Sequence, residues 1–351
     1  MSEINLVIDG YINTYYKDSI KIMMIMNDKK LITKRITHTF NVCRIVMACL
    51  LLLCITGCGN TGKDNSNYNF ENYEVSYQDL NLHMDSTYKS DFGEKNIILI
   101  HGLTYSSHEF DINYKDYSLV RFLADKGYTV WRLDIAGYGQ SDKPDDGFIV
   151  DSDYAADNIN YAVNDICNIT GAEKIDVLGW SWGTITTSRF VANHPEKVNK
   201  LILYAPIVSG IGASSVETDY HENSWENAAG DFQTNSNGEI DETIVEPEIV
   251  EYFCSSCWKY DGKGSPNGPR RDICVDTSVK LIDMSKITVP TLLIYGDADP
   301  YLNYELIDEM YKELPEGSKR EIIDGAAHCA YIEKPYYHSF QDAITNYLFA
   351  K

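Results

Sequence analysis

The sequence lacks two features that define large functional classes. Its longest apolar run, IVMACLLLLCI over residues 45–55, has eleven residues, whereas a membrane-spanning helix needs about 20. A polytopic membrane protein is therefore not expected. Positive charge is also scarce, because 30 Lys and Arg stand against 52 Asp and Glu, for a net charge of −22. Nucleic-acid binding needs a basic surface, so we expect no nucleic-acid partner.

The N-terminal 57 residues have the composition of an export signal. They carry seven basic and four acidic residues, so residues 58–351 carry about −22 − 3 = −25. A basic stretch that starts at Lys29 precedes the short apolar run, which is the layout of a signal peptide. Residues 1–25 lie outside this layout, and we therefore expect synthesis to start at Met26.

The apolar run ends in Ile55-Thr56-Gly57-Cys58, which resembles the lipobox of bacterial lipoproteins. The resemblance implies cleavage before Cys58 and attachment of lipid to its sulfur. The lipid would hold the exported protein on the outer side of the cell membrane, because two acyl chains suffice for stable anchoring. An ordinary cleaved signal and a buried core helix are the alternatives. Residues 58–72, rich in Gly, Asn and Ser, predict a flexible tether.

Beyond the tether, short β-like runs alternate with helical stretches. This order is typical of an α/β fold with a mostly parallel central sheet flanked by helices. An antiparallel pair is expected over residues 74–88 at one edge. Continuous apolar runs predict buried strands at residues 97–100, 128–131, 175–178, 201–204 and 291–295.

The alternation stops between residues 207 and 289. This stretch holds fifteen acidic and six basic residues, a net charge of −9, and predicts helices at 224–229 and 246–253. It is too long for a structureless loop, so we expect a lid inserted into a core formed by residues 73–206 and 290–351.

One motif carries the clearest chemistry. Gly179-Trp180-Ser181-Trp182-Gly183 follows a predicted strand and precedes a predicted helix. A serine there must occupy a sharp turn, and the two glycines let the strand and helix backbones approach. Such a turn exposes the hydroxyl at a helix N-terminus, where developing negative charge is favoured.

With this motif the chain resembles the α/β-hydrolase family. His101-Gly102 follows an apolar strand as in that family, and the resemblance implies an oxyanion hole from the backbone N–H groups of Leu103 and Trp182, with a structural role for the His101 side chain. The segment that begins at Asp134 matches the family's D-x-x-G-x-G-x-S turn, whose role is architectural.

The resemblance also implies the two partners of Ser181. The catalytic acid should follow a late strand in a G-x-x-D loop, which gives Asp299, with Asp297 as the alternative on the same turn. The histidine should be His328. The order serine, acid, histidine is the order of this fold, and a serine nucleophile argues against dehalogenase or epoxide-hydrolase chemistry.

These residues predict an enzyme that forms an acyl-enzyme on serine and hydrolyses a carboxylic ester, with a small-molecule ester or acyl substrate and no cofactor. The first alternative is a peptidase similar to the prolyl aminopeptidases, suggested by the acidic lid, although Leu103-Thr104 departs from their pattern. The second is a non-catalytic surface binding protein on a hydrolase scaffold.

The lid holds three cysteines that we expect to form one disulfide after export. Cys254, Cys257 and Cys274 allow three single bridges, and the sequence does not choose among them. A zinc site would need a fourth ligand, so no metal is predicted.

Overall fold

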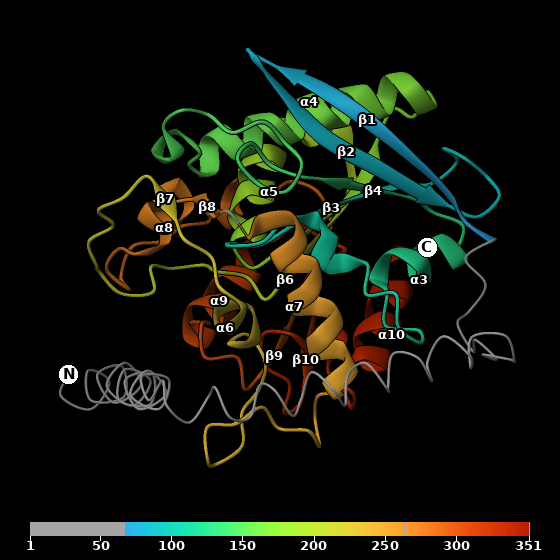
Figure 1. Cartoon of the computed structure of the whole chain (residues 1–351). Coiled ribbons are helices and arrows are strands. Elements are labelled where there is room, and N and C mark those ends of the chain that lie inside the picture. The colour runs from blue at the N-terminus through green and yellow to red at the C-terminus, as the bar shows by residue number, and fades with distance from the viewer. Residues whose placement is uncertain (1–66, 263, 351) are drawn as a thin grey trace, which may run out of the picture. The chain divides into compact units, whose positions relative to one another are not determined.

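The computed structural model describes residues 67–262 and 264–350. In these residues, eight strands form one sheet in the order β1-β2-β4-β3-β5-β6-β9-β10 (Figure 1). Within this sheet of the described residues, β1 pairs antiparallel with β2 and β2 with β4, while the other pairs are parallel. The strands of this sheet are β1 (Asn69–Tyr77), β2 (Leu80–Tyr88), β3 (Asn96–Ile100), β4 (Thr129–Leu133), β5 (Ile175–Trp180), β6 (Val198–Tyr204), β9 (Thr291–Gly296) and β10 (Lys319–Ile323). The predicted α/β class is confirmed.

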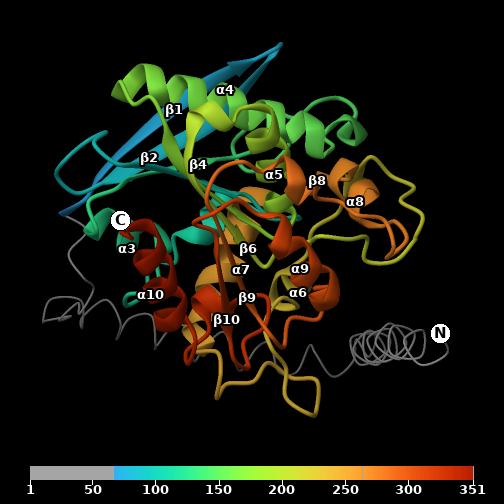
Figure 2. The same cartoon turned by 180° about the vertical axis from the view of Figure 1, so that it is seen from behind.

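Helices cover both faces of the sheet (Figures 1 and 2). The helices are α3 (Leu119–Asp125), α4 (Ser152–Thr170), α5 (Trp182–Asn193), α6 (Trp225–Ala229), α7 (Pro247–Asp261), α8 (Gly268–Ile273), α9 (Tyr304–Met310) and α10 (Tyr337–Leu348). Apolar residues of α4, α5 and α9 pack in one core cluster, and those of α3, α7 and α10 pack in the other.

The alternation of side chains along the buried strands builds these two cores. In β3, Ile98 and Ile100 belong to the first cluster, whereas Ile97 and Leu99 belong to the second. Successive side chains of a strand point to opposite faces, so a strand buried on both faces must be apolar at every position. This is why the continuous apolar runs of the sequence predicted these strands correctly.

The β1–β2 hairpin corrects one predicted boundary. The pair is antiparallel and lies at the edge of the sheet as expected, but β1 already begins at Asn69. The tether predicted to run to residue 72 therefore overlaps this strand. Asn69 is in register with Tyr88, and Asn72 is in register with Asp85. Pairing with β2 satisfies the backbone N–H and C=O groups of this polar segment, although its composition resembles that of a linker.

The segment between β6 and β9 has its own elements, as predicted. It contains α6, α7, α8 and a short antiparallel pair formed by β7 (Tyr220–His221) and β8 (Ser265–Pro266). Helix α7 continues to Asp261, well beyond the predicted end at residue 253. It packs against α6 and against η2 (Ser107–Phe110), a short 3-10 helix that follows β3. We call residues 207–289 the inserted segment.

Several predictions lie outside the described residues: the start at Met26, the signal segment 1–57 and the lipid site at Cys58. Among the residues that the structure does describe, no helix is both long and apolar enough to cross a membrane.

Candidate active site

Ser181 occupies the turn between β5 and α5 in a strained conformation, with φ 56° and ψ −123°. The two glycines make this turn possible. A Cβ on Gly179 would lie 2.3 Å from the carbonyl oxygen of Gly183, and one on Gly183 would lie 2.5 Å from that of Ile100. Within the described structure the Ser181 side chain does not cap α5, so its hydroxyl stays available at the positive end of the helix dipole.

Asp299, after β9, and His328, after β10, form a buried pair. The distance from His328 Nδ1 to Asp299 Oδ2 is 2.7 Å, and the two residues are only 5% and 2% exposed. The Tyr301 N–H donates to the other Asp299 oxygen at 3.0 Å. The carbonyl of His328 accepts from the Tyr204 hydroxyl at 2.6 Å and from the Trp180 indole at 3.3 Å. The imidazole is therefore fixed through Nδ1 and its backbone, which leaves Nε2 for chemistry.

The alternative acid, Asp297, lies on the same turn but has another partner. Its Oδ1 accepts a hydrogen bond of 2.7 Å from the N–H of Gly325. Of the two carboxylates that the sequence left open, the geometry therefore pairs Asp299 with His328.

Opposing effects act on the pKa of His328. Burial lowers it, but the charge of Asp299 and the hydrogen bond to it raise it, as do the charges of Asp231 and Glu333, and the net pKa is raised. Asp231 is a residue that the sequence analysis missed. Burial and the charge of Asp299 raise the pKa of Asp231 to about 6, while His328 opposes this rise. The carboxylate of Asp231, which belongs to the inserted segment, thus acts electrostatically on the Asp299–His328 pair.

The backbone after β3 runs directly beside Ser181. A Cβ on Gly102 would lie 3.1 Å from Ser181 Cβ and 3.7 Å from its Oγ. Leu103 follows Gly102, and Trp182 is the first residue of α5, so both residues predicted for the oxyanion hole belong to segments that adjoin the serine. The Gly102 N–H itself donates to Glu109 Oε1 at 3.2 Å, and burial raises the pKa of Glu109 well above its usual value.

His101 has a structural role, as predicted. Its Nδ1 donates to the carbonyl of Gly102 at 2.8 Å, and its Nε2 accepts from the N–H of Ile135 at 3.2 Å. Both ring nitrogens are therefore occupied in joining β3 to the turn after β4. Burial lowers the pKa of His101, which keeps the ring neutral, as these two bonds require.

The large aromatic side chains of the segment after β3, of the Ser181 turn and of the inserted segment differ in exposure. Trp180, Trp182, Tyr105 and Phe110 are buried in the cores, whereas Trp258 is 53% exposed. The ring of Trp180 lies against the imidazole, with its centroid 5.4 Å from that of His328, and the ring of Tyr301 contacts the same imidazole at 5.0 Å.

The predicted disulfide of the inserted segment is wrong. The five cysteines of residues 67–350 are free. Cys254 and Cys257 lie three positions apart on α7 and are both buried in the apolar core. Burial raises the pKa of Cys254 to about 12, so this thiol stays protonated. Cys274 follows α8, and the sequence pattern could not show that two of the three cysteines face a core.

Comparisons with known proteins agree with this geometry. Residues 95–214 match the family model described as the α/β hydrolase fold. The chain is 25% identical over 259 residues to an uncharacterised carboxylesterase of Bacillus subtilis, covering 69% of this chain and 75% of that protein. It is also 25% identical over 264 residues to the human serine hydrolase BPHL, covering 73% and 79%.

Solved structures show the same fold at lower identity. A bromoperoxidase from Bacillus anthracis superposes with a TM-score of 0.58 at 19% identity, covering 80% of this chain and all of that one. An esterase from Exiguobacterium antarcticum gives a TM-score of 0.57 at 18% identity with the same coverage.

Proposed function

We propose that this chain, which has the α/β-hydrolase fold, is a serine hydrolase that cleaves carboxylic esters. The observation that carries the proposal is the buried Asp299–His328 pair with its 2.7 Å contact, combined with the strained turn that presents Ser181 beside the backbone of Gly102. A backbone strain of about 1–3 kcal/mol persists only where the surrounding structure maintains it, and such strained residues cluster at active sites.

Each residue has a defined task in the mechanism. His328 Nε2 takes the proton of Ser181 as the serine oxygen bonds to the acyl carbon. The N–H groups of Leu103 and Trp182 stabilise the negative charge on the carbonyl oxygen. His328 then gives its proton to the departing alcohol, which leaves an acyl ester on Ser181. Water attacks this ester with His328 again as base, and the acid product and free serine result. Asp299 holds the imidazole tautomer and stabilises the imidazolium.

The preference for esters rests on the similarity of this chain to named esterases and on serine as the proposed nucleophile. The matched proteins include a carboxylesterase, a serine hydrolase and an esterase by name. A peptidase acting near a free amine is the second candidate, since Asp231 would offer a negative charge close to His328. Comparing kcat/KM for short-chain esters with that for proline amides separates the two, and a strong amide preference would reverse the order.

We place the enzyme outside the cytoplasm, anchored to the membrane by lipid on Cys58. The support is the resemblance of residues 55–58 to a lipobox after a basic and then apolar segment. Cys58→Ala should remain an unprocessed precursor that carries no lipid at residue 58. A variant that is still processed and membrane-bound would contradict the anchor.

A fluorophosphonate probe tests the catalytic proposal most directly, because it labels only an activated serine. The purified full chain should be labelled once, at Ser181 as located by mass spectrometry, and Ser181→Ala should not be labelled. Wild-type protein that is folded by circular dichroism but unlabelled would contradict the proposal.

A further inference from the structure

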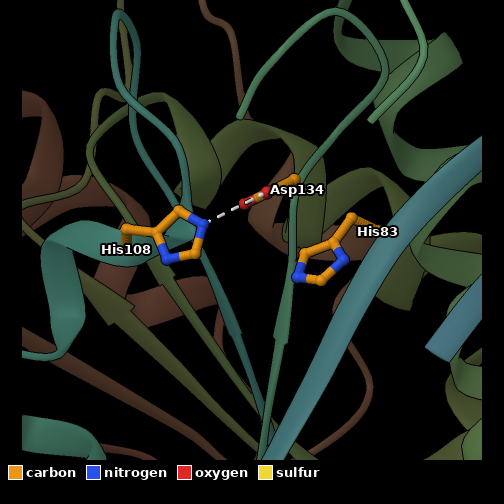
Figure 3. A group of neighbouring side chains, drawn as sticks. All are labelled: His83, His108 and Asp134. Atoms are coloured by element: carbon orange, nitrogen blue, oxygen red, sulfur yellow. Dashed lines mark ion pairs between the residues drawn. The ribbon is translucent and has the colours of Figure 1, made fainter. Parts of the chain in front are cut away.

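A cluster of two histidines and one aspartate lies apart from Ser181 and its partners. His83 belongs to β2, His108 to η2, and Asp134 follows β4 directly (Figure 3). One potential ligand atom from each residue lies within 4.8 Å of the other two. The contact between His108 Nε2 and Asp134 Oδ2 measures 3.6 Å. Two ligands at the zinc distances of about 2.0–2.1 Å in a tetrahedral site lie about 3.4 Å apart, so one edge of such a site already has the right length.

The exposed side chain of Gln140 fills the space between the two imidazoles. Its Nε2 lies 2.9 Å from His83 Nε2 and 3.5 Å from His108 Nε2. Both ring nitrogens therefore face one point, which the amide nitrogen of Gln140 occupies. Nε2 is one of the two ring nitrogens through which histidine binds a metal. Because Gln140 is exposed, its amide can turn into solvent and leave the space to an ion.

The carboxylate of Asp134 is fixed in position by its surroundings. Its Oδ1 accepts from the Ser107 hydroxyl at 2.6 Å and from the Ser107 N–H at 3.1 Å. Its Oδ2 accepts the N–H of Gln140 at 3.0 Å and keeps a second lone pair for another partner. The residue has no measurable exposure. Such supporting hydrogen bonds orient a ligand before the metal arrives.

A second carboxylate, Asp85, has its Oδ2 3.7 Å from His83 Nε2, but Arg132 compensates its charge. Asp85 makes two hydrogen bonds to Arg132, of 2.8 and 2.7 Å, in a buried pair. The ring of His108 stacks on Tyr260 of α7 with centroids 3.4 Å apart, which fixes its orientation. A surface pocket of about 310 Å³, lined by His108, Gln140 and Tyr260 among others, gives an entry path and room for water.

We propose that His83 Nε2, His108 Nε2 and Asp134 Oδ2 bind one divalent transition-metal ion, with Zn²⁺ the best fit and a water molecule from the pocket as fourth ligand. Imidazole nitrogen with one carboxylate oxygen suits zinc, whereas magnesium and calcium prefer all-oxygen sites. The ion would join β2, η2 and the turn after β4, and would stabilise the segment that follows the predicted oxyanion loop. Its three ligands are spread over 52 residues of sequence, so no spacing motif announces them.

Metal titration of the full chain tests this site. We expect the chelator-stripped wild type to bind Zn²⁺ at this site by calorimetry, and Co²⁺ to give the visible absorption of a four-coordinate ion. The double variant His83→Gln/His108→Gln should lose this binding step and the Co²⁺ spectrum, with affinity reduced more than about 100-fold, since loss of an outer-shell partner alone costs about 10–100-fold.

Two variants serve as controls. His338→Gln removes a histidine that is 63% exposed in its side chain and lies 4.0 Å from Asp116, and it should bind as the wild type does. Gln140→Ala should bind at least as tightly as the wild type, because the amide no longer occupies the space. Near-ultraviolet circular dichroism establishes that each variant is folded. If a folded double variant keeps the wild-type Zn²⁺ binding and Co²⁺ spectrum, or if the wild type binds neither ion, the proposal is overturned.

Discussion

Replacing Asp299 with Asn removes the negative charge on which the proposed mechanism depends. The carboxylate lies 2.7 Å from His328 Nδ1, and both residues are buried. Asn has nearly the same shape, but it can present an N–H to Nδ1 and so favour the wrong imidazole tautomer. In a serine–histidine–aspartate site this change lowers kcat by about 10⁴-fold, which corresponds to about 5.4 kcal/mol at 1.36 kcal/mol per tenfold. We expect a loss of this order in ester hydrolysis.

The same variant should shift the pH profile. His328 must be neutral to accept the serine proton, and Asp299 raises the pKa of His328 above the value that burial alone would give. Loss of the charge lowers this pKa, so the acidic limb of kcat/KM should move to lower pH. Initial rates with a short-chain ester between about pH 5 and pH 9 measure both effects.

Asp297→Asn is the matched control. This carboxylate lies on the same turn but binds the N–H of Gly325, so most of the activity should remain and the acidic limb should stay in place. Equal losses in the two variants, or an Asp299→Asn enzyme within about tenfold of wild type, would refute the assignment of Asp299 as the residue that orients the imidazole.

Three further variants, with Gly230→Ala as a control for the first, test stability. Gly183→Ala places a Cβ 2.5 Å from a β3 carbonyl oxygen, and urea denaturation should show a loss of about 1–3 kcal/mol or more; Gly230→Ala, with no contact closer than 3.3 Å, should change little. The pKa of Asp231 rises from 3.8 to about 6 on folding, so the ionised carboxylate destabilises the folded state at pH values above about 6. Asp231→Asn should therefore raise Tm at pH 8. Below about pH 4, where the carboxyl is protonated in the folded and unfolded states, the variant should leave Tm unchanged. Asp85→Ala leaves the buried Arg132 without its bidentate partner and should cost about 3–5 kcal/mol in the same urea assay.

The parts of the fold that the sequence predicted are those governed by local pattern. Continuous apolar runs identified the parallel strands, because a strand buried on both faces has no polar position. The turn at Ser181 was equally visible, since its two glycines are a local steric requirement. Strand pairing is not local, so composition placed the end of the tether too late and missed the pairing of Asn69 with Tyr88.

Contacts between distant segments account for what the sequence could not show. Asp231 belongs to the inserted segment, and only folding brings its charge to bear on His328. His83 and His108 are likewise distant in the sequence, and only folding brings them together beside Asp134. For the cysteines, spacing suggested a disulfide, but a helix that buries Cys254 and Cys257 in a core gives each thiol an apolar environment of its own.

The two strands that flank the inserted segment are immediate neighbours in the sheet, paired in parallel from Leu201 with Thr291 to Tyr204 with Ile294. A crossover of about a dozen residues could join these parallel strands, so most of the segment between them is an addition that leaves the strand order unchanged. The entropy of closing a longer connection grows only with the logarithm of its length. We therefore expect that this segment can be exchanged for another of different size and charge without moving Ser181 or His328, so that a chimaera made at these two strands keeps both proposed catalytic groups in place.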